Sequence, residues 1–100
     1  MRVLLSRGIA IDGVFAANDL MAVGAMAALE ESGHRIAEDV AVVGFDDSLI
    51  AQTTRPALTT IRQDIMGLGE AVAELMIQKL AGEETFSRIL PTELVVRESA

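Results

Sequence analysis

The chain has 100 residues, enough for one small domain or a piece of a larger one, and 51% of them are hydrophobic. Eight basic and fifteen acidic residues give a net charge of −7, and the scattered arginines make no clustered patch of the kind that binds a nucleic-acid backbone. The lack of cysteine excludes disulfides, cysteine–zinc sites and cysteine nucleophiles, and no apolar run reaches the roughly 18–20 residues that span a bilayer. We therefore expect a cytoplasmic domain with neither a membrane segment nor a secretory signal.

The chain opens on a short helical pattern over residues 1–7, which Gly8 closes as a C-cap residue. A helix this short is marginal by itself, so we expect it to be the end of an element that begins before Met1. A loop containing the turn-prone pair Asp12-Gly13 follows.

Residues 14–17 and 40–45 are two apolar, β-prone runs, and each stops at a short amide or carboxylate side chain. Between them, residues 20–31 have a helical pattern that Gly33 ends. This order predicts a β–α–β unit with two parallel strands. The second run is continuous rather than alternating, so we expect its strand to be buried on both faces.

The helix over residues 20–31 is apolar over more than half of its circumference. Leu20, Val23 and Ala27 lie along one side, and Met21, Ala25, Ala28 and Leu29 add a second side. One side must cover the sheet, and we expect the other to cover a partner.

The second half of the chain continues with shorter elements. Residues 48–54 predict a short helix or an irregular loop, which the pair Arg55-Pro56 breaks. Residues 58–63 are rich in β-branched side chains and predict a third strand. A last strand is expected over residues 89–96, with Pro91 marking an edge or a bend.

A long helix is predicted over residues 65–81, with Gly82 as its stop signal. Its apolar residues fall on one stripe, formed by Ile65, Leu68, Val72, Leu75, Met76 and Leu80.

Asn18, Asp46 and Gln63 each come at or just after the end of a predicted strand. If the three strands are parallel, these side chains converge on one edge of the sheet, where open α/β sheets bind ligands. Amide and carboxylate groups offer donors and acceptors to a polyhydroxylated or amide-bearing ligand. Asn18 and Asp46 could instead cap the helices that follow them, and spacing alone does not separate the two roles. Their equivalent places on one edge favour the ligand.

The remaining polar residues give no sign of catalysis. Asp46-Asp47 lacks the further acidic or histidine ligands of a strong metal site, and the only lysine, Lys79, lies inside a predicted helix rather than at a strand end as in receiver domains. His34, in a loop past a helix C-terminus, is expected to be solvated. No nucleophile elbow or phosphate-binding glycine loop is present. We expect that the protein is not an enzyme and that it has no catalytic residues, no cofactor and no metal site.

Four segments follow one another along the chain: "VFAANDLMAVGAMAALEESG", "EDVAVVGFDD", "LTTIRQD" and "LPTELVVRES". In this order and spacing, they resemble the C-terminal part of the LacI/GalR family of bacterial transcriptional repressors. The resemblance runs from about Asp12 to the end of the chain. It implies an α/β fold, a parallel sheet with flanking helices that forms an incomplete, Rossmann-like C-terminal lobe of the periplasmic-binding-protein type.

The resemblance also implies a role for several residues. Asn18, Asp46 and Gln63 fall on positions where the family contacts a small effector, often a sugar or a purine, and Phe15 falls where some members stack an aromatic ring on it. The family typically forms homodimers through this lobe, and the matching surface here comprises Leu20, Val23, Met26, Ala27, Glu30, Ile50 and Thr54. DNA would be bound only through a helix-turn-helix headpiece, which these residues do not contain.

The chain departs from the family in carrying only part of the sensor. Residues 1–63 and 88–100 would be elements of the C-terminal lobe, and the helix over residues 64–82 would belong to an absent N-terminal lobe. We expect that helix either to pack onto its own sheet or to pair with another copy of the chain. Two other interpretations stay open: the sugar-binding lobe of a transport protein, and a truncated fragment that only self-associates.

Overall fold

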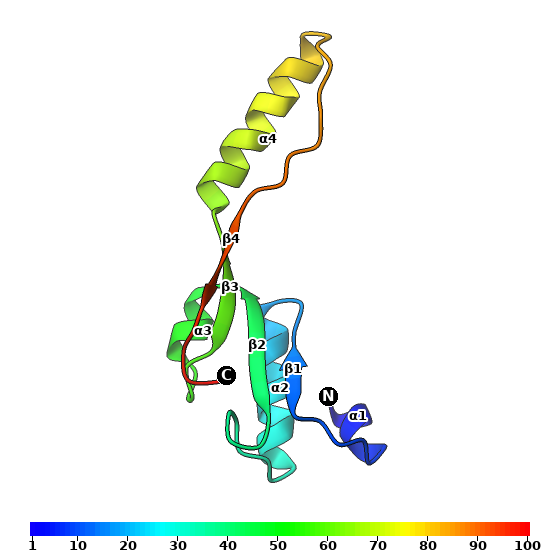
Figure 1. The fold of residues 1–100 in the computed structure, drawn as a ribbon, viewed down its shortest axis with the longest axis vertical. Helices are drawn as coiled ribbons and strands as arrows, with labels where there is room; N and C mark the ends of the chain where they lie inside the picture. Colours follow the sequence, from blue (N-terminus) through cyan, green and yellow to red (C-terminus); the bar gives the residue numbers. More distant parts are fainter. The chain divides into compact units, whose positions relative to one another are not determined.

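The computed structural model describes all 100 residues and forms a four-stranded sheet with helices (Figure 1). In chain order the elements are α1 (Arg2–Ser6), β1 (Gly13–Phe15), α2 (Asp19–Glu31), β2 (Ala41–Asp46), α3 (Leu49–Thr53), β3 (Thr59–Gln63), α4 (Ile65–Leu80) and β4 (Thr92–Val95). The strands are arranged in the order β1-β2-β3-β4, and β4 runs opposite to β3 (Figure 1).

The β–α–β unit predicted from the sequence is confirmed. β1 pairs with β2 in parallel, with Phe15 opposite Val43, and β2 pairs in parallel with β3, with Asp46 opposite Arg62. All three carboxyl ends therefore lie at one edge of the sheet. Gly33 has a φ of +84° just past the end of α2, the left-handed conformation that favours glycine at this position.

The hydrophobic core lies between α2 and the sheet. Ala22, Met26 and Leu29 of α2 pack with Val42 of β2 and with Leu58, which precedes β3. The same helix exposes other apolar side chains, including Leu20 and Met21. One side of α2 thus covers the sheet, as its doubly apolar pattern predicts, and the second side remains exposed.

The expectation that β2 is buried on both faces is wrong. Val42 and Gly44 are buried on the face toward α2, whereas Ala41, Val43 and Phe45 on the other face are only half-buried. A continuous apolar run permits burial on both faces of a strand, but a face is buried only where a helix or another layer covers it. Here the opposite face receives no helix equivalent to α2.

The last strand is shorter than predicted. β4 covers only Thr92–Val95, and residues 83–91 have no regular secondary structure. Ile89, expected to be in this strand, is 98% exposed, because the chain before Pro91 has no neighbouring strand with which to pair.

The chain divides into two compact units: Met1–Arg62 with Glu93–Ala100, and Gln63–Thr92. The second unit extends to Thr92, beyond the end of α4. Whether that unit belongs to another lobe stays a prediction. None of the helices combines the length and the hydrophobicity of a membrane-spanning segment.

The second unit contains α4, which begins as the sequence predicts. The Asp64 side chain caps it by accepting a hydrogen bond of 2.9 Å from the Gly67 backbone N–H, and Gly82 follows its end with a φ of +79°. Only Ala71 of this helix is buried. Its exposed apolar side chains are Ile65, Met66, Leu68, Val72, Met76, Ile77 and Leu80.

Candidate functional site

The edge formed by the carboxyl ends of β1 and β2 carries the first two predicted ligand residues. Asn18 lies three residues beyond the end of β1, at the start of α2, and Asp46 is the last residue of β2. We define this pair, with the side chains around it, as the strand-end site. Parallel pairing of the strands places both residues at one edge of the sheet.

Asn18 caps α2, the alternative role that the sequence left open. Its backbone is extended, and its Oδ1 accepts a hydrogen bond of 2.8 Å from the Met21 backbone N–H. This bond occupies the carbonyl oxygen and not the amide nitrogen of the same side chain. Capping α2 therefore does not use the amide nitrogen of Asn18.

Asp46 and Asp47 form the turn at which the chain leaves β2. Their φ angles are +109° and +52°, in a region where side chains other than glycine are strained. Asp46 is exposed, whereas the Asp47 side chain is only 5% exposed. The strained backbone thus turns two adjacent carboxylates into different surroundings.

Asp47 is held by two arginines, and sequence reasoning gave it no role. Its Oδ1 accepts from Arg97 Nη2 at 2.5 Å, and its Oδ2 accepts from Arg62 Nε at 2.6 Å. Burial raises the pKa of Asp47, but the hydrogen bonds and positive charges of both arginines outweigh it and hold that pKa below its ordinary value. Both oxygens of Asp47 are therefore engaged by side chains of the same chain.

Asp19, the first residue of α2, is a second buried carboxylate. Its Oδ1 accepts a 2.5 Å hydrogen bond from the Thr60 hydroxyl, and its Oδ2 accepts from the Ser48 backbone N–H at 2.7 Å and hydroxyl at 2.8 Å. The start of α2 is thereby tied to β3 and to the chain before α3. An acidic residue directly after the N-cap was the only sequence signal for it.

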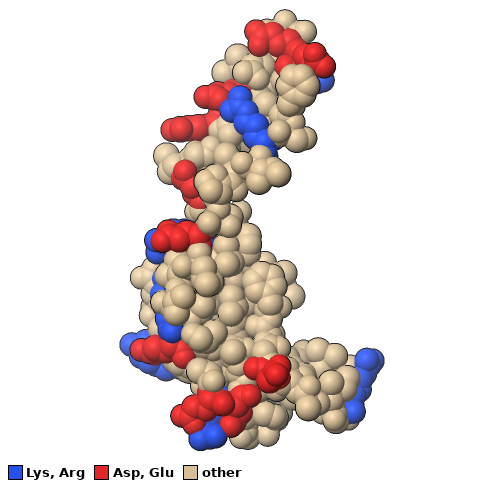
Figure 2. Space-filling view, in the orientation of Figure 1, with Lys and Arg blue, Asp and Glu red and all other residues tan.

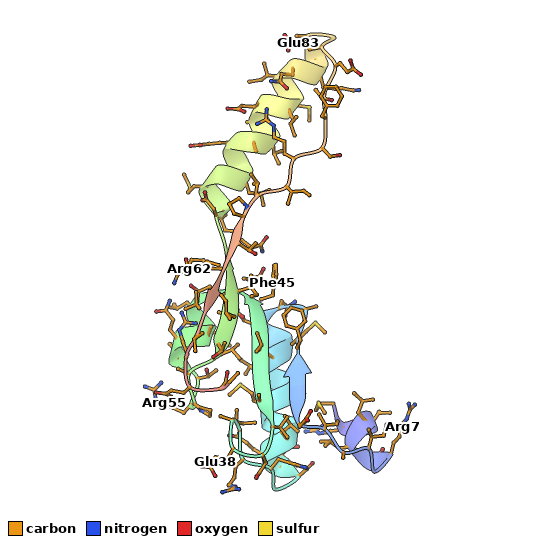
Figure 3. All side chains as sticks on the ribbon, viewed as in Figure 1. Arg7, Glu38, Phe45, Arg55, Arg62 and Glu83 are labelled. Atoms are coloured by element: carbon orange, nitrogen blue, oxygen red, sulfur yellow. The ribbon has the colours of Figure 1, made fainter.

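The two phenylalanines at this edge form an aromatic pair. Phe15 of β1 and Phe45 of β2 meet edge to face, with ring centroids 6.5 Å apart. Phe15 is 66% exposed, so much of its ring remains open to a ligand. Figure 3 shows Phe45 and Arg62 near the ends of β2 and β3. Sequence reasoning singled out Phe15 and missed Phe45, whose ring packs against that of Phe15.

Gln63, the third predicted ligand residue, is the last residue of β3 and the first of the second unit. Within that unit it lines a pocket of about 280 Å³ with Leu68, Ala71, Val72, Leu75, Arg88 and Leu90. Arg88 in this unit also pairs with Glu74 at 2.7 Å.

Six of the seven residues of the predicted dimer surface are exposed or half-buried. Leu20 is 70% exposed, Ala27 and Glu30 are exposed, and Val23 is half-buried on the same helix. Ile50 and Thr54, around α3, are half-buried. Met26 is 4% exposed and lies in the core, so its side chain adds nothing to this surface. Helical period alone did not show which side of α2 faces the sheet.

The other titratable residues add no second site. No group of three or more histidine or acidic side chains could hold a metal ion. His34 is half-buried, and its Nδ1 is buried without a hydrogen-bond partner, against the expectation of a solvated ring. On the face in Figure 2, Lys and Arg side chains are scattered among acidic and other residues.

Residues 4–100 match the family model of the periplasmic binding protein-like domain. The HTH-type transcriptional regulator CelR of Thermobifida fusca is 45% identical over 101 residues, which cover 99% of this chain and 30% of CelR. The lactose operon repressor of Escherichia coli strain K12 is 39% identical over 97 residues, which cover 96% of this chain and 27% of the repressor. The chain therefore spans less than a third of the length of these two relatives.

Two solved structures resemble the chain over nearly all of its length. One is the transcriptional regulator CelR in complex with cellobiose, with a TM-score of 0.89, 44% identity, and coverage of 99% of this chain and 31% of that one. The other is the lac repressor dimer bound to operator and the anti-inducer ONPF, with a TM-score of 0.89, 38% identity, and coverage of 98% and 35%.

Proposed function

Because the chain belongs to the periplasmic binding protein-like domain family, among relatives that are LacI-family transcriptional regulators, we propose that it is part of the sugar-sensing and dimerising region of such a regulator. The main observation in support is the strand-end site, where Asn18 and Asp46 lie at the same edge of the sheet as the largely exposed Phe15 ring. Gln63 would complete the contacts to the effector.

The chemistry of this edge suits a sugar. The exposed carboxylate of Asp46 accepts hydrogen bonds from hydroxyl groups, and the Asn18 amide donates them. The apolar face of a sugar ring packs against an aromatic ring such as Phe15. No catalytic constellation accompanies these groups, so ligand binding rather than turnover is the proposed activity, and its effect would be a population shift between sensor conformations.

Dimerisation and DNA binding have different support. The exposed side of α2, with Leu20 at its start, supports a homodimer through α2 and α3. The negative net charge argues against operator contact through these 100 residues. DNA contact would use a helix-turn-helix headpiece, as the family resemblance implies, and a cytoplasmic location follows from the proposed role in transcription.

The test is a titration of the isotope-labelled chain with cellobiose, lactose and ribose, followed by backbone amide shifts. We expect at least one sugar to shift residues 15–18 and 45–47, with a Kd on the order of 1 mM, because one lobe supplies only part of the contacts. Asp46→Ala should abolish the shifts. Asp12→Ala removes the same charge at the opposite end of β1 and serves as the matched control. No shifts with any of the three sugars would overturn the proposal.

A further inference from the structure

Asp47 lies between two arginines that come from different parts of the chain. Arg62 is on β3, and Arg97 follows β4. Each oxygen of the carboxylate accepts a hydrogen bond from one guanidinium, at 2.6 Å from Arg62 and 2.5 Å from Arg97. The Asp47 side chain is 5% exposed and that of Arg97 is 15% exposed, so this pair is largely withdrawn from solvent, whereas the Arg62 side chain is half-exposed. Charged hydrogen bonds of this kind are the strong ones.

The two arginines stand close to the places where the chain leaves and re-enters the first unit. Arg62 is its last residue before the second unit, and Glu93 is the first residue after it. Arg62 Nη1 lies 3.5 Å from Glu93 Oε2, so one guanidinium contacts both Asp47 and the returning strand. Arg97 Nη1 also donates a hydrogen bond of 2.8 Å to the Leu58 carbonyl oxygen. This bond anchors the C-terminal segment beside the start of β3.

The turn that Asp47 occupies needs such an anchor. Asp46 and Asp47 both have positive φ, a conformation that costs free energy and persists only where neighbouring contacts impose it. The Thr60 hydroxyl oxygen is 3.4 Å from the Asp47 backbone N–H, too long for a strong bond, so the two arginines make the short hydrogen bonds of this residue. On either side of it, Asp46 pairs with β3 and Ser48 is bonded to Asp19.

We propose that Asp47 is a positioning residue that, through Arg62 and Arg97, fixes the turn carrying Asp46 to the two strands by which the chain crosses out of and back into this unit. This inference rests on the proposed function for the role of Asp46. It adds that the Asp46 turn and the crossing strands move together. Binding of a ligand at the strand-end site would therefore first change the contacts of Arg62 and Glu93.

Amide hydrogen exchange on the full 100-residue chain tests the positioning role without any ligand. In Asp47→Asn, which keeps the size and removes the charge, we expect exchange at residues 45–48, 61–63 and 92–95 to rise roughly tenfold or more. Asp39→Asn is the matched control, since Asp39 is an exposed carboxylate bonded only to Arg35 within its own loop. It should change exchange at residues 35–39 alone.

Arg62→Gln provides a second variant if Asp47→Asn does not fold, because the Arg62 side chain is half-exposed and its loss leaves the Arg97 pair in place. It should raise exchange at residues 45–48 although Arg62 lies on another strand. Unchanged exchange at the crossing strands in Asp47→Asn, or at residues 45–48 in Arg62→Gln, would overturn the inference.

A cellobiose titration separates this inference from the proposed function. If the wild-type chain binds cellobiose, Asp47→Asn should weaken binding roughly tenfold although Asp46 is retained. An unchanged midpoint would contradict the positioning role. If the wild-type chain binds no sugar of the panel, the proposed function fails, and the exchange measurements alone decide whether Asp47 holds the turn.

Discussion

At the start of α2 the helix passes so close to β2 that only glycine fits beneath it. A Cβ atom built on Gly44 would collide with the Asp19 carboxylate, lie 2.9 Å from Leu58 Cδ2 and lie 3.3 Å from the Asp19 Cα. Asp19 cannot move aside, because both of its oxygens are bonded to Thr60 and Ser48. The close approach thus serves the buried carboxylate and not a ligand.

Gly44→Ala should therefore lower the free energy of unfolding by about 1–3 kcal/mol, the usual cost of overpacking a core. Gly69→Ala is the control: it lies inside α4 with no atom within 4 Å of the new Cβ, and should be neutral or stabilising by up to about 1 kcal/mol. Urea denaturation measures both. Equal stability of the two variants would show that the helix can shift away from the strand.

The ion pairs of Asp47 predict a dependence of stability on pH. Its pKa is lower in the folded chain than the ordinary 3.8, so its contribution is fully present above that value and is lost as pH falls through the folded pKa. Asp47→Asn should cost about 1–3 kcal/mol at pH 7, discounted for the half-exposed Arg62, and the difference from wild type should shrink below about pH 4. Urea midpoints measured from pH 3 to pH 7 would reveal a constant difference if this account is wrong.

At the scale of elements, α2 and α4 both expose apolar side chains, but they differ in what lies behind them. α2 buries six of its residues, including Ala22, Met26 and Leu29, and so presents its exposed side from a fixed position on the sheet. α4 buries only Ala71. A rigid apolar surface loses less entropy on association, which favours α2 as the dimer surface.

We expect Leu20→Glu to shift the chain toward monomer in sedimentation velocity, because it places a charge where Leu20 is 70% exposed at the proposed dimer surface. Met76→Glu makes the same chemical change on the exposed stripe of α4 and should leave the dimer intact. The reverse pattern, with association lost only in Met76→Glu, would assign self-association to α4.

At the scale of the whole molecule, the first unit contains the core, the strand-end site and the Asp47 ion pairs. Ser99, near the C-terminus, donates to the Val42 carbonyl at 2.6 Å and accepts from the Thr59 backbone N–H at 2.8 Å, bridging β2 and β3. The segment after the second unit thus completes the first one. The second unit contributes none of these contacts.

Replacing residues 63–92 by the turn Asn-Gly should leave the first unit folded, because Arg62 and Glu93 are already in contact and β3 neighbours β4 with opposite direction. Circular dichroism should retain a cooperative thermal transition. Binding of a dye specific for exposed apolar surface should fall, since the stripe of α4 is removed. Loss of the transition would mean that the second unit is needed for folding.

The sequence by itself determined the elements and their order. Helical periodicity, the stop signals Gly33 and Gly82 and the apolar runs before Asn18 and Asp46 are local properties, and parallel strands follow from a β–α–β order. This was enough to place the predicted ligand residues at strand ends and to state the family resemblance, which the comparisons bear out.

Only the tertiary structure decided which polar and apolar side chains are inside. It buried Asp19 and Asp47 rather than Asp46, turned Met26 into the core and away from the predicted dimer surface, and shortened the last strand to Thr92–Val95. Burial and ion pairing depend on neighbours distant in the chain, such as Arg97 for Asp47, fifty residues apart. No local pattern carries that information, because it arises only when the strands and the C-terminal segment come together.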